Sequence, residues 1–245
     1  MSHWFRSYTA LLVWTGLRSR ATLLLNVIIQ TLLAVGIIVG FGFLVPSVDP
    51  VTALFFASGA PVLGLVTVGM VIGPQEVASA KQEGIFEFNR SLPVPRSALV
   101  ASSATVGLVT AIPGVLASLF VAELRFDLDY AISPLIVLAV LLTGLASIGI
   151  GYAIGYGLPP EGSRLVSQLV VFIALMFSPI TFPASRLPGW FETIHEFLPF
   201  KYMGEAVRNT LVVPPQGVPT LAFVVLAVWA AAGFLLAFRM VSRRV

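Results

Sequence analysis

Six long apolar stretches dictate where this chain can fold. They cover residues 21–45, 51–73, 98–122, 132–157, 165–182 and 219–238. About 20 consecutive apolar residues suffice for an α-helix to cross the hydrocarbon core of a bilayer. The chain is 58% hydrophobic and 10% charged, whereas soluble domains are about one quarter charged. The sequence therefore predicts an all-α membrane protein in which residues 1–245 form a single domain with six transmembrane helices.

The positive charges between these stretches predict how the chain crosses the membrane. Lys and Arg concentrate in the cytoplasmic loops of membrane proteins. If six helices alternate in direction, ten of the 14 Lys and Arg residues fall on one side. These ten are Arg6, Arg18, Arg20, Lys81, Arg90, Arg96, Arg164, Arg239, Arg243 and Arg244. We therefore expect a multi-pass protein of a bacterial inner membrane, with both termini in the cytoplasm.

Residues 1–20 precede the first apolar stretch and show a moderate amphipathic pattern. On a helical wheel the apolar arc contains Trp4, Phe5, Tyr8, Leu11 and Leu12, and the opposite arc contains Arg6, Thr9 and Arg20. A helix of this kind lies in the interface between lipid and water. We expect an N-terminal amphipathic helix on the membrane surface; an additional contact with a cytoplasmic partner is an alternative.

The absence of ionisable side chains from the apolar stretches restricts the chemistry that this protein can perform. Enzymes and ion-coupled carriers that act within a bilayer depend on such groups, and none of the six stretches has an Asp, Glu, Lys, Arg or His. The chain has no Cys, and His3 and His195 would lie on opposite faces of the membrane, so no metal site is expected. No basic run is dense enough to bind nucleic acid. We expect a non-catalytic chain that binds no cofactor itself; a sodium-coupled carrier, whose sites can consist of backbone carbonyls, is an alternative.

A few side chains within the stretches are candidates for contact with a transported molecule. Asn26 and Gln30 lie four residues apart on one face of the first stretch. Hydrogen bonding between helices is the favoured interpretation of this pair, and substrate contact is the alternative. Phe172, Phe177 and Phe182 are candidates for the wall of a substrate pathway, with packing against lipid or other helices as an equal alternative.

The fourth apolar stretch carries a Gly-x-x-x-Gly pair, Gly151 and Gly155. In membrane helices this spacing lets two backbones approach closely. We expect these glycines to form a packing face and not a dinucleotide-binding loop, because no strand–turn–helix pattern surrounds them.

The connection between the second and third stretches, residues 74–97, carries acidic and basic residues close together. If it is helical throughout, Glu83, Glu87 and Arg90 fall on one face, where the two Glu residues repel each other slightly. A cationic groove on a partner would relieve this repulsion. From the residues alone, a solvated interfacial helix with its Phe side chains against lipid is an equal alternative.

The connection between the fifth and sixth stretches, residues 183–218, is long, polar and aromatic. Pro188 is placed to start a short helix. In this helix one face would hold Trp190, Ile194 and Phe197, while Glu192, His195 and Glu196 would face water. A plain external loop with aromatic side chains at the membrane surface is the alternative.

These two connections resemble those of the permease subunits of type-2 ABC exporters. In the first, the matching residues are the pair Glu83-Gly84, the following Glu87 and the run Leu92-Pro93-Val94. In the second, the matching runs are 178–183, 187–190, 198–202 and 205–208, in the order found in the family. With the six apolar stretches and the leading amphipathic helix, the resemblance extends over nearly the whole chain.

The resemblance assigns roles to both connections. In this family the first long loop forms a cytoplasmic coupling helix that docks on an ATP-hydrolysing subunit; here its residues would be Glu83, Gly84, Glu87, Arg90 and Pro93. The second connection would form short external re-entrant helices, around Pro183, Pro188, Trp190 and Pro199.

The resemblance also implies the function, that of a permease subunit of an ATP-driven exporter. The chain has no Gly-x-x-x-x-Gly-Lys-Ser/Thr loop, so ATP and Mg would be bound by a separate ATP-binding ABC subunit, present in two copies. A second permease subunit, identical or paralogous, and membrane lipids complete the expected partners. Uncharged spans favour an amphipathic or hydrophobic cargo, either a drug-like molecule or a lipid.

Two classes of alternative remain open at this stage. Within the same family, the cargo is a polysaccharide or a lipid-linked glycan. Outside it, the chain is a non-transporting membrane scaffold or sensor, or an ion-coupled carrier. The match to the coupling loop favours the exporter over both, by analogy.

Overall fold

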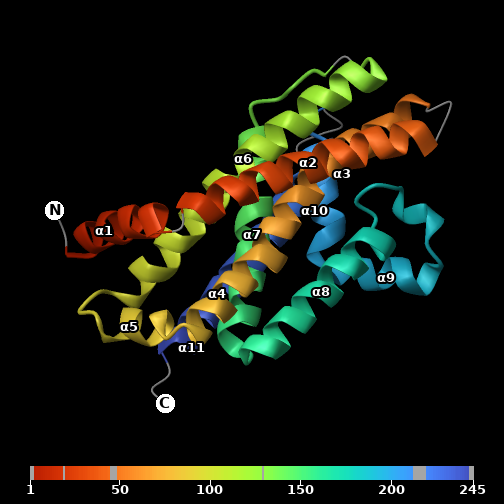
Figure 1. The fold of residues 1–245 in the computed structure, drawn as a ribbon. Helices are drawn as coiled ribbons and strands as arrows, with labels where there is room; N and C mark the ends of the chain where they lie inside the picture. The colour runs from red at the N-terminus through yellow and green to blue at the C-terminus, as the bar shows by residue number, and fades with distance from the viewer. Residues whose placement is uncertain (1–2, 19, 45–48, 129, 212–218, 243–245) are drawn as a thin grey trace.

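The computed structural model describes residues 3–18, 20–44, 49–128, 130–211 and 219–242, and within them every regular element is a helix. Six of the described helical segments are long and apolar enough to cross a membrane. Figure 1 shows them as a bundle, with α1, α5 and the end of α11 at one end and α9 towards the other. The predicted all-α membrane fold is therefore confirmed.

The helices follow one another along the chain with short connections. The first half contains α1 (His3–Arg18), α2 (Arg20–Leu44), α3 (Pro50–Thr67), the π-helical segment η1 (Val68–Ile72), α4 (Gly73–Gln82), α5 (Ile85–Ser91) and α6 (Arg96–Phe126). The second half contains α7 (Ile136–Gly157), α8 (Pro160–Phe177), the short 3-10 helix η2 (Ala184–Arg186), α9 (Gly189–Phe197), α10 (Pro199–Arg208) and α11 (Thr220–Ser242). Residue 45 of the first predicted span, residues 212–218 of the external segment, and Arg243 and Arg244 lie outside the described residues.

The second predicted span continues as a helix into the polar connection that follows it. Together α3, η1 and α4 form one rod from Pro50 to Gln82, which is 33 residues long. Pro74 is the second residue after the π-helical segment, whose wider turns accommodate a residue that cannot donate a backbone hydrogen bond. Residue 73 therefore marks a change from apolar to polar side chains and not the end of a helix. A continuous rod of this kind can pass a displacement of its polar end to its apolar part.

Glycines of α7 allow this rod to pack unusually close. A Cβ at Gly151 would overlap the carbonyl oxygen of Gly69 in η1, and a Cβ at Gly155 would lie 3.0 Å from the Cβ of Val77 in α4. On its other side α7 meets α11, where a Cβ at Gly149 would lie 3.1 Å from a backbone carbonyl oxygen. The predicted packing role of Gly151 and Gly155 is confirmed.

Candidate functional site

The end of α4 and the start of α5 form a sharp elbow at Glu83 and Gly84. Gly84 has a φ of 73°, in the left-handed region that a residue without a Cβ adopts most easily. Because of this turn, Glu83 ends α4 while Glu87 and Arg90 belong to α5. The prediction of a single helix with all three on one face is therefore wrong: the left-handed residue breaks the helix between them.

Beyond the elbow, α5 presents an acidic and aromatic surface. The Glu87 side chain is 67% exposed and that of Arg90 only 14%, and the two form an ion pair with an N–O distance of 3.3 Å. The Arg90 guanidinium lies 5.5 Å from the ring centroid of Phe86, while the Phe88 side chain points outward and is 53% exposed. The exposed charge of α5 is thus negative. After Pro93 the chain turns directly into α6.

Lys81, on the last turn of α4, joins the elbow to α7. Its Nζ donates hydrogen bonds to the carbonyl oxygens of Gly155 at 2.8 Å, Tyr156 at 3.0 Å and Leu158 at 2.8 Å. The last carbonyls of a helix lack partners within it and carry partial negative charge, which an ammonium group neutralises. The elbow cannot move relative to the end of α7 without breaking these bonds.

A second pair of contacts joins α4 to α8. The Ser163 hydroxyl donates to the carbonyl oxygen of Pro74 at 3.4 Å, and the Arg164 guanidinium donates to the side-chain oxygen of Gln82 at 2.8 Å. The elbow is therefore fastened to two membrane-spanning helices. Local sequence patterns could not predict the contacts of α4 with α7 and α8, because the bonded residues lie more than 70 positions apart in the chain.

Replacing Lys81 with Met should weaken the attachment of α4 to α7. The change keeps the length of the side chain and removes the donor of three hydrogen bonds, each accepted by a backbone carbonyl. We expect a loss of about 2–3 kcal/mol of stability, measured as a lower melting temperature of the purified protein in detergent. Lys201→Met, which removes the other lysine of the chain, is the matched control; equal melting temperatures for both variants would contradict the assignment.

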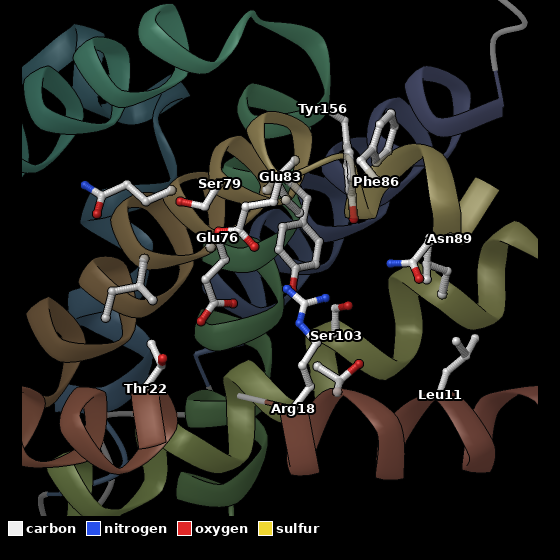
Figure 2. Close-up of a pocket in the computed structure, with 18 of the residues that line it drawn as sticks. Leu11, Arg18, Thr22, Glu76, Ser79, Glu83, Phe86, Asn89, Ser103 and Tyr156 are labelled. Carbon is white, nitrogen blue, oxygen red and sulfur yellow. The ribbon is translucent and has the colours of Figure 1, made fainter. Parts of the chain in front are cut away.

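A cavity of about 530 Å³ opens beside the elbow. Residues of α1, α2, α4, α5, α6 and α7 line it, with the charged residues Arg18, Glu76 and Glu83 and the rings of Tyr152 and Tyr156 among them. Figure 2 shows the Arg18 and Glu76 side chains directed into the same space. Sequence reasoning did not single out Arg18 or Glu76 as a site, because they belong to helices that are brought together only by packing.

The structure separates the residues proposed for a substrate pathway. Asn26 lines the cavity, whereas Gln30 is 2% exposed and packs at Gly64 and Gly114, with no hydrogen-bond partner for its amide nitrogen among the described residues. Phe172 and Phe177 lie on the exposed surface of α8, with ring centroids 6.4 Å apart. The half-buried Phe182 follows that helix, and none of the three rings lines this cavity. A role for them in transport stays a prediction.

The described part of the segment predicted to be external contains three short helices, each preceded or begun by a proline. Pro188 directly precedes α9 and Pro199 begins α10, while Pro183 precedes the short helix η2. Trp190, Ile194 and Phe197 are exposed together on α9, as their spacing predicted. His195, which was expected to face water, is fully buried. Its ring lies edge-on to that of Phe191, with centroids 4.7 Å apart. Of the three residues predicted to face water, only Glu196 is exposed, while Glu192 is half-buried.

Arg208, at the end of α10, holds the external segment against the bundle. Its Nε donates to the Ser58 hydroxyl in α3 at 3.1 Å, and a terminal nitrogen donates to the carbonyl oxygen of Ile180 at 2.7 Å. The guanidinium also lies 3.6 Å from the ring centroid of Phe55. Burial lowers the pKa of Arg208 to about 10, so the group keeps its charge at neutral pH. One side chain thus joins α10, α3 and the segment that follows α8.

Comparison with known proteins identifies the family to which these elements belong. Residues 8–212 match the family model described as ABC-2 type transporter. The matched region starts within α1 and ends after α10, so it includes the elbow, the cavity and the α9–α10 segment. No curated protein matches the chain. Because the family model covers most of its length, the chain belongs to the ABC-2 type transporter family and is a membrane-spanning permease subunit.

Proposed function

We propose that this permease is driven by a separate ATP-hydrolysing subunit that docks on the elbow and α5. Two such subunits, carrying ATP and Mg, and a second permease, identical or paralogous, would complete the exporter. The observation that carries the proposal is the exposed acidic and aromatic surface of α5, formed by Glu87 and Phe88 at one end of the bundle. Behind this surface, Lys81 fastens the elbow to α7. A displacement of α5 by the docked subunit would therefore be transmitted to the membrane-spanning helices.

We propose that the elbow faces the cytoplasm of a bacterial cell and that the membrane is the inner one. Lys81, Arg90, Arg96 and Arg164 lie at the ends of helices that meet at the elbow. The preference of Lys and Arg for cytoplasmic loops supports this orientation. The α9–α10 segment would then lie at the outer surface, where its exposed aromatic side chains suit the membrane interface.

The proposed cargo is an amphipathic or hydrophobic compound, either a drug-like molecule or a lipid. The spans provide no array of positive charges that would stabilise a strongly anionic cargo within the membrane. Hydrolysis of ATP on the partner would rock the permease helices and release the cargo outward. The chain itself would act without catalysis.

Reversing the charge of Glu87 tests the docking surface. Glu87→Arg removes the exposed negative charge of α5 and places a positive charge where a cationic groove of the partner is expected. We expect recovery of the ATP-hydrolysing subunit with the tagged permease to fall at least about tenfold, because like charges at an interface cost several kcal/mol. The measurement is co-purification in mild detergent, with the recovered chains identified by mass spectrometry.

The matched control is Glu123→Arg, which makes the same change at an exposed position near the far end of α6. This variant should recover the partner as well as the unmodified permease does. Full recovery and full transport by Glu87→Arg would refute docking at α5. Reproducible absence of any ATP-hydrolysing subunit from the unmodified protein would instead favour a scaffold or a gradient-driven carrier.

A further inference from the structure

Three charged side chains line the cavity beside the elbow, Arg18, Glu76 and Glu83, and among the described residues Arg18 and Glu76 form no ion pair with each other. Arg18 is the last residue of α1 and Glu76 lies in the first turn of α4. Figure 2 shows the guanidinium and the carboxylate directed into the cavity. Among the described residues neither has a hydrogen-bond partner, and no nitrogen of Arg18 lies within 4.0 Å of a Glu76 oxygen. Both charges therefore remain available to a ligand.

The remaining lining offers further contacts for a positively charged group. Tyr152 and Tyr156 have ring centroids 5.7 Å apart, and Phe86 lies 5.7 Å from Tyr156. Aromatic faces attract ammonium groups electrostatically. Asn89 and Glu83 also line the cavity and add a polar and an acidic side chain to its wall.

An apolar surface adjoins the cavity. The Trp14 side chain on α1 is exposed and also lines the cavity, and the exposed side chains of Val13 and Leu17 continue from it around the same helix. A molecule whose polar head occupies the cavity can keep its hydrocarbon chain along this surface. In the proposed orientation α1 lies at the cytoplasmic membrane interface, the depth at which lipid headgroups are found.

We propose that this cavity binds the zwitterionic headgroup of an amphiphile, with its phosphate on Arg18 and its ammonium on Glu76. Arginine binds phosphate through paired hydrogen bonds, and the carboxylate and aromatic rings bind the ammonium. A simple cation would leave Arg18 unpaired, and a simple anion would leave Glu76 unpaired. The volume of about 530 Å³ lies in the range of sites for small ligands, roughly 300–1,000 Å³. The site lies within one permease subunit and needs no second copy.

Competition between defined probes tests the proposal on the unmodified protein. Native mass spectrometry of the purified chain would compare single-chain amphiphiles with hydrocarbon chains of equal length: lysophosphatidylethanolamine, lysophosphatidylglycerol and an alkyltrimethylammonium. We expect the zwitterionic probe to be retained about tenfold more strongly than the other two, because only it satisfies both charges. Equal retention of all three probes would show binding to apolar surface alone and overturn the proposal. Stronger retention of the cationic probe would overturn it in favour of a cation site.

Variants then assign the two charges. Arg18→Met and Glu76→Gln should each weaken binding of the zwitterionic probe about tenfold, and the exchange of both charges, Arg18→Glu with Glu76→Arg, should restore part of it. Arg6→Met on the same helix and Glu161→Gln at the start of α8 are matched controls that should bind normally. Loss of binding in the controls, or normal binding in both cavity variants, would overturn the assignment. Because the probe competition uses the unmodified chain, a variant that fails to fold does not decide the outcome.

Soluble glycerophosphoethanolamine distinguishes a headgroup site from a lipid groove. This molecule has the same phosphate and ammonium without an acyl chain. We expect it, at high concentration, to displace the zwitterionic probe. Failure to displace the zwitterionic probe would show that the chain and not the headgroup is recognised. None of these measurements depends on ATP or on the partner, so a failure of the proposed export function would leave their result unaffected.

Discussion

Gly151→Ala should destabilise the bundle more than any other single methyl group added to α7. A Cβ at this position would overlap the carbonyl oxygen of Gly69, and a backbone carbonyl in a helical rod cannot rotate away as a side chain can. The two helices would have to separate along their length. Overpacking of this kind costs about 1–3 kcal/mol and occasionally more, and we expect the upper end.

The measurement is thermal unfolding of the purified protein in detergent. For a chain of this size, about 3 kcal/mol corresponds to a fall in melting temperature of roughly 6–12 °C. Gly157→Ala on the same helix is the matched control, because a Cβ there would meet only the flexible side chain of Met240, at 3.9 Å. The same melting temperature for the two variants would show that α7 and η1 have room to adjust.

Arg208→Met should release the external segment while leaving the elbow unchanged. The variant removes the donors to Ser58 and Ile180 and the contact with Phe55. Leaving a buried carbonyl without its partner costs about 1–3 kcal/mol, and the lost contact with the aromatic ring adds to this. We expect protease sensitivity between α8 and α10 to rise strongly and transport to fall at least about tenfold.

Recovery of the proposed ATP-hydrolysing subunit should not change in this variant, because Arg208 contacts Ser58, which lies towards the opposite end of the α3–α4 rod from the elbow. Unchanged recovery would show that the loss of transport comes from detachment of the α9–α10 segment and not from failure of the partner to dock. Arg186→Met, which removes an exposed positive charge from the same external segment, is the matched control. Arg208→Lys should restore function only in part, because an ammonium group lacks the planar geometry that reaches two acceptors and stacks on a ring. Normal transport and normal protease resistance in Arg208→Met would contradict the role assigned to this residue.

The sequence was sufficient to predict the membrane-spanning helices because the cost of placing polar groups in hydrocarbon acts on each stretch separately. The same holds for the packing role of Gly151 and Gly155, since the spacing of two glycines on one helix is a local property. Pro188 likewise indicated the start of α9. These features depend on neighbours in the chain and on the surrounding solvent.

Tertiary structure decided which groups meet. Gly84 adopts a left-handed conformation that separates Glu83 from α5, although the spacing of Glu83, Glu87 and Arg90 fits one continuous helix. Lys81 meets carbonyls of α7 that are 74 to 77 residues away, and Arg208 meets a hydroxyl 150 residues away. The burial of His195 also follows from packing of α9 and not from its own sequence.

Arg18 and Glu76 illustrate the same limit at the cavity. Each residue, taken alone, reads as a charge near the end of an apolar stretch, where such charges are common. Both side chains line the same cavity because α1 packs across the bundle and because α3 continues as a helix into α4. Apolar patterning determined which segments enter the membrane, because the hydrophobicity of a segment is the sum of contributions from its own residues. The pairing of charges was decided by the fold, because it depends on distances between helices that no local pattern encodes.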